Sequence, residues 1–201
     1  MTARIIADLG FEVVYVTGAG IANMRLGVPD IGLVTLSELA DTVATIADIC
    51  TLPLIVDADS GFGSAVHMVR TVRMLERAGA NAIQIEDQTF PRRTGQSAAP
   101  EVISAEEMMG KVKAAADARS SHDLLIIART DARTTHGMQA ALARANAYIA
   151  AGADATFIEA PTSRDELEIL TRSLRVPQIA NMVARWSDAK SIAGRISGDW
   201  G

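Results

Sequence analysis

The sequence predicts an α/β fold, a TIM-type (β/α)8 barrel that this chain follows for about six βα units. Strand-like runs alternate with amphipathic helical patterns throughout, at the spacing of roughly 25–35 residues that is typical of βαβ units. The strand runs are continuously apolar, as in parallel strands buried on both faces. Five of these runs end on charged or amide residues, and the carboxyl ends of barrel strands are where such barrels carry their chemistry.

The length of 201 residues is sufficient for one domain with a sizeable core. A complete eightfold barrel usually needs about 250 residues and eight strands. We therefore expect residues 1–201 to form a single barrel domain that is incomplete at both ends. A fragment, a shortened gene product and a sheet completed by another subunit would each explain this length.

Helix boundaries in the first half are marked by glycines and by one capping box. Gly10 and Gly79 each follow an amphipathic run and are good helix stops. Thr35 and Glu38 have the spacing of a capping box, so a helix should begin there. The predicted elements are helix 2–9, strand 11–17, helix 35–49, strand 52–56, helix 65–78 and strand 82–85.

The second half repeats the same alternation. Ser104 with Glu107 has the spacing of another capping box, Ser163 with Glu166 opens a further helix, and Gly152 stops the helix before it. The predicted elements are helix 104–119, strand 124–128, helix 138–151, strand 155–158, a helix from 163, strand 177–180 and a last short helix from Ser187.

Composition excludes several classes of protein. The net charge of −5 and the absence of a basic cluster argue against a nucleic-acid partner. No apolar run approaches the roughly 18 residues of a membrane span, and the first residues lack a secretory signal. The single cysteine, Cys50, cannot form an internal disulfide, so we expect a reducing compartment: the cytoplasm, or the mitochondrial matrix in a eukaryote.

Three acidic residues at two successive strand ends indicate a metal site. Asp57 and Asp59 are two residues apart and point to the same side of an extended backbone, and Glu86 ends the next strand. Carboxylates without a nearby His or Cys favour Mg²⁺ or Mn²⁺ over zinc. The alternative for each acid is a solvated loop residue or a helix cap.

Polar residues that end later strands indicate binding of an anionic substrate. Arg129 ends a buried strand, and its guanidinium fits a carboxylate or phosphate bidentately. An internal salt bridge to Glu159 or Asp131 is the alternative. Asn181 could donate to a substrate carboxylate or act as a cap.

The first strand is followed by a glycine pair. Gly18 and Gly20 hint at a dinucleotide fingerprint, but Asn23 stands where the third glycine belongs. A tight turn whose backbone N–H groups face an anion is the better interpretation. Asp30 is either a rim residue or an ordinary turn residue.

The segment 87–102 is the longest polar stretch and follows directly on an acidic strand end. Its position predicts a lid over the rim, with an ordinary surface loop as the alternative. The three histidines are dispersed and none has metal-ligand spacing with another.

Together these residues resemble the isocitrate lyase and phosphoenolpyruvate mutase superfamily. The resemblance spans nearly the whole chain in order, and the Asp-x-Asp-x-Gly-aromatic-Gly run with its Glu-Asp-Gln strand end is specific. The matching stretches are 16–20, 26–30, 57–63, 85–88, 127–131, 151–154 and 177–181.

The resemblance implies a Mg²⁺-dependent carbon–carbon lyase, methylisocitrate or dimethylmalate lyase-like. Its substrate would be a small 2-hydroxy or 2-oxo di- or tricarboxylate, and it would act through a metal-stabilised enolate. It also implies a homo-oligomer, a dimer or a tetramer. The implied roles are metal shell for Asp57, Asp59 and Glu86; substrate contact for Thr17, Gly18, Ala19, Asp57, Arg129, Glu159 and Asn181; and catalysis for Arg129, Asp30 and Glu86.

The lid departs from the family pattern. Members that cleave isocitrate or methylisocitrate carry Lys-Lys/Arg-Cys-Gly-His, with the cysteine as acid/base. This chain has Arg92, Arg93, Thr94, Gly95 and Gln96 at these positions. A threonine hydroxyl has too high a pKa to replace that thiol, and the Lys-x-Asn-Ser lid of the phosphonate mutases is absent too.

Other functions therefore stay open. An oxaloacetate decarboxylase and a phosphonopyruvate-type enzyme, carboxyphosphonoenolpyruvate mutase-like, are the catalytic alternatives. An inactive, truncated metal-binding remnant is the non-enzyme alternative, and a dinucleotide-binding domain is a third.

Overall fold

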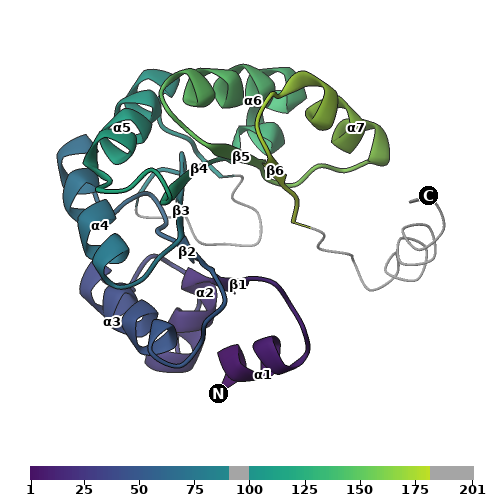
Figure 1. The fold of residues 1–201 in the computed structure, drawn as a ribbon. Helices are drawn as coiled ribbons and strands as arrows, with labels where there is room; N and C mark the ends of the chain where they lie inside the picture. Colours follow the sequence, from purple (N-terminus) through teal and green to yellow (C-terminus); the bar gives the residue numbers. More distant parts are fainter. Residues whose placement is uncertain (91–99, 182–201) are drawn as a thin grey trace.

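The computed structural model describes residues 1–90 and 100–181. Six parallel strands form one sheet in chain order, and each strand pairs with its neighbour in the sequence. The sheet curls, and helices line its outer side in an arc, so the described chain is a partial TIM-type barrel (Figure 1). The strands are β1 (Val14–Val16), β2 (Leu54–Asp57), β3 (Ala82–Glu86), β4 (Leu125–Thr130), β5 (Ala155–Ile158) and β6 (Gln178–Ile179). The helices are α1 (Thr2–Asp8), α2 (Gly18–Ile21), π-helix η1 (Ala22–Leu26), α3 (Leu36–Ala47), α4 (Ala65–Arg77), α5 (Ala105–Ala118), α6 (Ala132–Ala150) and α7 (Arg164–Ser173).

Side-chain caps determine where the long helices begin. Thr35 and Glu38 form the predicted reciprocal capping box at the start of α3. At the starts of α5 and α7, the hydroxyls of Ser104 and Ser163 accept the N–H three residues further on, which is half of such a box. The serine and threonine signals in the sequence therefore placed three helix starts correctly.

Three predicted elements need correction. The first strand spans only 14–16 instead of 11–17, because a turn at Gly10 (φ +80°) precedes it and it pairs with β2 alone. Residues 18–26 form α2 and η1, which the sequence did not reveal because their glycines and lack of a side-chain cap hide a helix. Helix α6 begins at Ala132, since a kink at Gly137 (φ +82°) joins a first turn to the predicted helix. The predicted helix from Ser187 lies outside the described residues.

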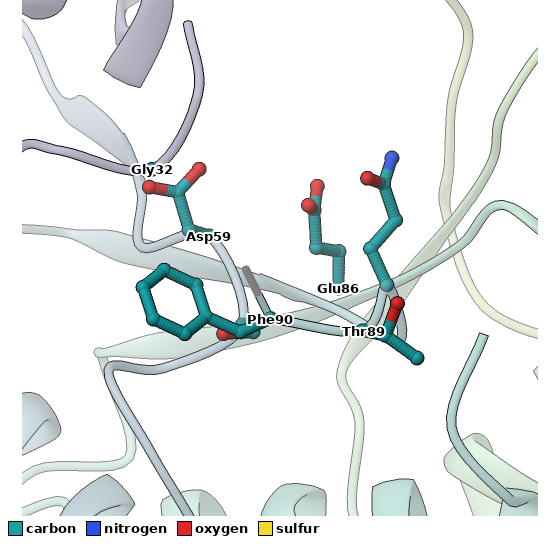
Figure 2. A pocket seen from close by; sticks show the side chains of 7 residues that line it. Gly32, Asp59, Glu86, Thr89 and Phe90 are labelled. Carbon is teal, nitrogen blue, oxygen red and sulfur yellow. The ribbon is translucent and has the colours of Figure 1, made fainter. Parts of the chain in front are cut away.

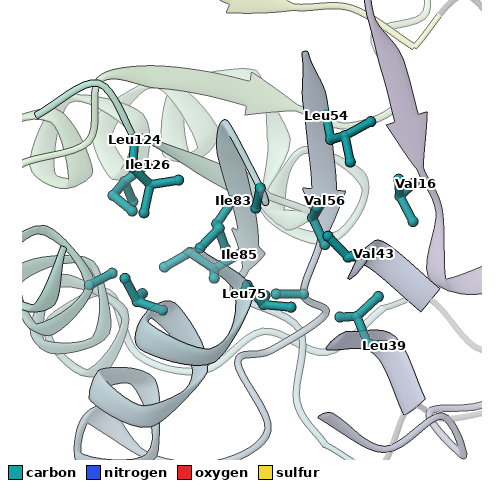
Figure 3. Close-up of a cluster of buried hydrophobic side chains, with 14 of the residues drawn as sticks. Val16, Leu39, Val43, Leu54, Val56, Leu75, Ile83, Ile85, Leu124 and Ile126 are labelled. Carbon is teal, nitrogen blue, oxygen red and sulfur yellow. The ribbon is translucent and has the colours of Figure 1, made fainter. Parts of the chain in front are cut away.

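The two faces of the sheet carry different side chains because direction alternates along a strand. On β3, Ile83 and Ile85 are fully buried in the core beneath the helices (Figure 3). Gln84 and Glu86 point to the inner side, where Glu86 pairs in register with Arg129 of β4. The outer face therefore carries the main core, and the inner face carries these polar side chains together with a smaller apolar cluster of Ala82, Ile127, Ala155 and Phe157.

The structure also shows where the single cysteine lies and how long and apolar its helices are. Cys50 is buried beside Ala3, as a small core residue would be. Within residues 1–90 and 100–181, no helix combines the length and apolar character needed to cross a membrane.

Candidate active site

A small hollow lies at the carboxyl end of the sheet. Asp59 and Glu86 line it, and their carboxylates point to the same side of the strands (Figure 2). Phe90 forms part of its wall and packs against Gly32, where an added Cβ would come within 2.8 Å of the ring. The remaining lining residues are Ser60, Gln88 and Thr89.

Asp57, Asp59 and Glu86 lie together at the ends of β2 and β3. Asp57 Oδ1 accepts the Asp59 N–H at 3.2 Å and the Gln84 side-chain amide at 3.3 Å. The Glu86 N–H donates to the Asp59 carbonyl at 2.9 Å. All three acids are buried, at 8%, 8% and 1% exposure, and these hydrogen bonds bring the two strand ends that carry them next to each other.

The arrangement limits how these acids could hold a cation. Among the residues that the structure describes, no three His, Cys, Asp or Glu side chains converge as a ready-made metal cage. Mg²⁺ commonly takes only one or two carboxylates directly and keeps several waters. Buried oxygen ligands beside a hollow fit that mode, and they do not fit a fully protein-coordinated ion.

The loop after β2 has an unusual backbone. Asp59 (φ +48°) and Phe62 (φ +60°) occupy the left-handed region, which costs energy for residues other than glycine. Gly61 has φ +85°, and a Cβ there would lie 2.0 Å from the Met68 methyl carbon. Asp59 lines the hollow in this conformation, and the positive φ at position 61 favours glycine there.

Hydrogen bonds fix the carbonyl groups of the same loop. Lys111 of α5 donates its ammonium to the Ser60 carbonyl at 3.1 Å, and the Thr71 hydroxyl donates to the Gly61 carbonyl at 3.0 Å. Lys111 is only 4% exposed, and burial lowers its pKa. A buried cation therefore serves as a tether behind the acidic loop.

Arg129 sits among three carboxylates on the inner face. Its Nε and Nη2 donate to both oxygens of Asp131 at 3.0 and 2.9 Å, while Glu86 and Glu159 lie 3.5 and 3.6 Å away. The guanidinium also lies 5.0 Å over the Phe157 ring. Burial alone would lower the pKa of Arg129, but its hydrogen bonds to Asp131 and the neighbouring charges raise it. The internal ion pair foreseen as an alternative is thus present at the predicted substrate residue.

Glu159 and Asn181 meet at the ends of β5 and β6. Asn181 donates its amide to Glu159 Oε1 at 3.2 Å. The other oxygen, Oε2, is buried without a hydrogen-bond partner among the described residues, although Arg129 is 3.6 Å away. Ala160, the next residue, has φ +58°.

Thr17, Gly18 and Ala19 form the start of α2 instead of the predicted tight turn. The Thr17 side chain makes no capping bond, and the first N–H groups of any helix lack intrahelical acceptors. A Cβ on Gly18 would lie 3.4 Å from Asp59 Oδ1, so the helix start approaches the acidic loop closely. Asp30 is half-buried in the loop that leads to Gly32.

The predicted lid residues Arg92, Arg93, Thr94, Gly95 and Gln96 lie outside the described residues. The segments that flank them are paired: Gln88 forms an antiparallel bridge with Val102, and the Thr89 N–H donates to the Glu101 carbonyl at 2.9 Å. Both flanks therefore lie side by side next to the hollow.

Two inner-face residues were missed from the sequence. The Tyr15 hydroxyl donates to Gln84 Oε1 at 2.8 Å, and Gln84 in turn donates to Asp57. Burial, with the nearby charge of Asp57, raises the pKa of Tyr15. The one usable signal was Gln84 itself, a polar residue inside an apolar strand.

Comparison with known proteins gives a consistent set of relatives. The family model described as phosphoenolpyruvate phosphomutase matches residues 1–194. The 2,3-dimethylmalate lyase of Eubacterium barkeri is 47% identical over 183 residues, which cover 91% of this chain and 63% of that protein. The 2-methylisocitrate lyase of Aeropyrum pernix is 49% identical over 180 residues, which cover 90% of this chain and 58% of that protein. This chain thus spans less than two thirds of the length of either relative.

Solved structures agree with the sequence matches. A crystal structure of 2,3-dimethylmalate lyase, described as a PEP mutase/isocitrate lyase superfamily member, has a TM-score of 0.85 at 33% identity and covers 95% of this chain and 67% of its own. Phosphonopyruvate hydrolase in complex with oxalate and Mg²⁺ has a TM-score of 0.82 at 33% identity and covers 98% of this chain and 69% of its own.

Proposed function

Because this chain belongs to the phosphoenolpyruvate phosphomutase family and is similar to a 2,3-dimethylmalate lyase and a 2-methylisocitrate lyase, we propose that it is a Mg²⁺-dependent carbon–carbon lyase acting on a small 2-hydroxy or 2-oxo di- or tricarboxylate. One observation carries the proposal most directly. Glu86 and Arg129, which have opposite charges, lie 3.5 Å apart where the acidic strand ends meet the arginine strand end. A metal-chelating carboxylate substrate needs both kinds of group within one site.

Asp57, Asp59 and Glu86 are the groups that would hold the cation, Mg²⁺ or Mn²⁺. Their burial beside one hollow supports this, as does the oxalate and Mg²⁺ complex of a related hydrolase. The bound cation would neutralise charge that develops on the enolate oxygens during bond cleavage. Asp30, in the loop beside the hollow, would orient water near the cation.

Arg129, Glu159 and Asn181 would bind the organic part of the substrate. Asp131 accepts from Nε and Nη2 on one edge of the Arg129 guanidinium, so Nη1 is the nitrogen that remains for a substrate carboxylate. The buried Oε2 of Glu159 could accept a hydrogen bond from a substrate hydroxyl. The N–H groups of Gly18 and Ala19, with the Thr17 hydroxyl, would complete the cradle for the other carboxylate end.

The substitution in the lid favours a second candidate. With Thr94 in place of a thiol, this chain lacks the usual acid that protonates the enolate product. That candidate is an oxaloacetate decarboxylase or a phosphonopyruvate-type enzyme, because this chain carries Thr94 where the isocitrate-cleaving lyases carry the thiol.

The test is a panel of oxaloacetate, methylisocitrate, dimethylmalate and phosphonopyruvate assayed with Mg²⁺. We expect turnover of at least one compound, its loss in EDTA and its return with Mg²⁺. Asp57→Ala and Arg129→Ala should be inactive, while Asp117→Ala, whose side chain is 64% exposed, should retain activity.

Two other results would contradict the proposal. Normal activity in Asp57→Ala would rule out the proposed metal site. Binding of Mg²⁺ and oxalate without any turnover would indicate the inactive remnant instead of an enzyme.

A homo-oligomer, a dimer or a tetramer, belongs to the same proposal. Leu9 and Phe11 near the first strand are 70% and 60% exposed, which supports burial against another polypeptide surface. Light scattering on the purified chain measures the mass. The cytoplasm is the proposed compartment, supported by the single unpaired cysteine.

A further inference from the structure

We propose that Asp87 is a positioning residue that holds Arg129 in place for the substrate carboxylate from the opposite face of the sheet. The proposal rests on the function proposed above, because it takes Arg129 as the anion-binding group. Asp87 follows Glu86 directly but lies on the helix-facing side, where it has no access to the hollow.

Asp87 is a buried hub for hydrogen bonds. Its side chain is fully buried at 0% exposure, a position that a carboxylate occupies only when its oxygens are well satisfied. Oδ2 accepts from the Thr130 hydroxyl at 2.6 Å, the Tyr148 hydroxyl at 2.8 Å and Arg144 Nη1 at 3.2 Å. Oδ1 accepts the Asp131 N–H at 3.0 Å. We call Asp87, Thr130, Asp131, Arg144 and Tyr148 the Asp87 cluster.

The Asp87 cluster holds the backbone at and next to Arg129 in place through hydrogen bonds. The Asp87 N–H donates to the Arg129 carbonyl at 3.2 Å, and the Asp87 carboxylate binds Thr130 and the Asp131 N–H. Three successive residues at the end of β4 are therefore bonded to one acid. Helix α6 supplies Arg144 and Tyr148, which anchor that acid to the outer layer.

The position of Asp131 determines the position of the Arg129 guanidinium. Asp131 accepts hydrogen bonds from two guanidinium nitrogens of Arg129, at 3.0 and 2.9 Å. Glu86 and Glu159 lie 3.5 and 3.6 Å from the same guanidinium. If Asp131 moved, Arg129 would gain by pairing with Glu86 or Glu159, because oppositely charged groups in a buried site attract strongly. These are the acids proposed for the cation and the substrate. The Asp87 cluster thus prevents Arg129 from pairing closely with Glu86 and Glu159, so these two acids stay available for the cation and the substrate.

The same strand offers a matched control. Asp154 accepts the Ile126 N–H at 2.8 Å and Arg119 Nη1 at 2.6 Å, at the amino end of β4. It therefore resembles Asp87 in bonding a β4 backbone N–H and an arginine, but it lies at the end of the strand away from the hollow.

The experiment measures oxalate binding by titration calorimetry in excess Mg²⁺, together with urea unfolding, so that neither readout requires turnover. We expect Tyr148→Phe to weaken oxalate binding by roughly threefold to tenfold, the effect of one lost hydrogen bond passed on to Arg129. Asp87→Asn should weaken it by more than about tenfold, since its amide would face three donors. Asp154→Asn should lower the urea midpoint but leave the oxalate affinity unchanged. If Asp87→Asn does not fold, the oxalate affinity of Thr130→Val is measured in its place.

A double mutant separates positioning from general stability. In an Arg129→Lys background, we expect Tyr148→Phe to cause no further loss of oxalate affinity, because its effect passes through the Arg129 fork. Additive losses would overturn the proposal, as would unchanged oxalate affinity in both Tyr148→Phe and Thr130→Val.

Failure of the two proposals can be told apart. If the unmodified chain does not bind oxalate, or Arg129→Lys binds it equally well, the proposed function fails. If Arg129→Lys weakens binding while changes in the Asp87 cluster do not, only the positioning role of Asp87 fails.

Discussion

The two halves of the candidate site are held in different ways. In the proposed metal half, Asp57, Asp59 and Glu86, backbone geometry shapes the loop: Asp59 has a positive φ angle, its N–H donates to Asp57, and the Glu86 N–H donates to the Asp59 carbonyl. The arginine half, Arg129 with Asp131 and Glu159, is fixed by ion pairs between side chains. Space and main-chain conformation should therefore limit substitutions in the first half, and charge balance should limit them in the second.

The largest effect should come from removing the central charge of the arginine half. Arg129→Ala leaves Asp131, Glu86 and Glu159 facing one another, and breaking such a buried pair typically costs about 3–5 kcal/mol of unfolding free energy. Urea denaturation measures this cost. The control is Arg172→Ala, whose side chain is 80% exposed and should change stability by less than about 1 kcal/mol. Equal stability of the two variants would remove the basis for the comparison.

In the metal half, a substitution that strains the backbone should lower the unfolding free energy. Gly61→Ala places a Cβ 2.0 Å from the Met68 methyl carbon at φ +85°, and we expect it to cost about 1–3 kcal/mol of unfolding free energy.

Gly110→Ala is the matched control for this prediction. Position 110 lies within α5 with no neighbouring atom inside 4 Å, so alanine should stabilise the chain by about 0.5–1 kcal/mol. Both values come from the same denaturation series. A harmless Gly61→Ala would mean that the loop after β2 adapts, and that the metal half is not held by its backbone.

Lys111 allows a finer test, because its buried ammonium donates to the Ser60 carbonyl of that loop. Burial lowers its pKa, so the unfolded chain binds this proton more tightly than the folded chain does. Between the lowered pKa and the ordinary value of 10.5, the unfolding free energy should therefore rise with pH.

The measurement is the difference between the unmodified chain and Lys111→Met in urea unfolding at several alkaline pH values. Taking the difference removes contributions from Tyr15 and Tyr148, whose raised pKa values act in the opposite direction. A difference that does not change with pH would show that the Lys111 ammonium is not destabilised by burial.

The smallest effect is expected at the edge of the arginine half. Asn181 is exposed and makes one hydrogen bond of 3.2 Å to Glu159, so Asn181→Ala should change stability by less than about 0.5 kcal/mol. If Asn181 contacts substrate, KM should rise for the compound that the assay panel identifies. A large loss of stability would instead assign it a structural role.

The sequence predicted the architecture well where one local signal decides. The Thr35 and Glu38 pair and the glycines after α1, α4 and α6, Gly10, Gly79 and Gly152, located boundaries, because capping and positive φ depend on a few neighbouring residues. The start of α2 was missed because Thr17 makes no side-chain capping bond and the glycines at positions 18 and 20 disfavour a helix.

The same distinction applies to the site. Polar strand ends could be recognised because the carboxyl ends of parallel strands meet at one rim, and Asp57, Asp59, Glu86 and Arg129 do gather there. The partners of Arg129 could not be chosen between Asp131 and Glu159, since that choice depends on distances across strands. Asp87 stood out only as part of the Glu-Asp-Gln strand end, and its partners could not be foreseen because the donors Arg144 and Tyr148 come from a helix more than fifty residues later.

The alternation along β3 also makes this barrel a practical starting point for engineering. Ile83 and Ile85 are committed to the core beneath the helices, whereas Gln84 and Glu86 face the inner side. A library that varies Gln84 and its inner-face partner Tyr15 can therefore sample new pocket shapes while every core side chain is kept. The core residues and the inner-face residues alternate along β3, so the inner-face residues can be substituted while the core residues are kept.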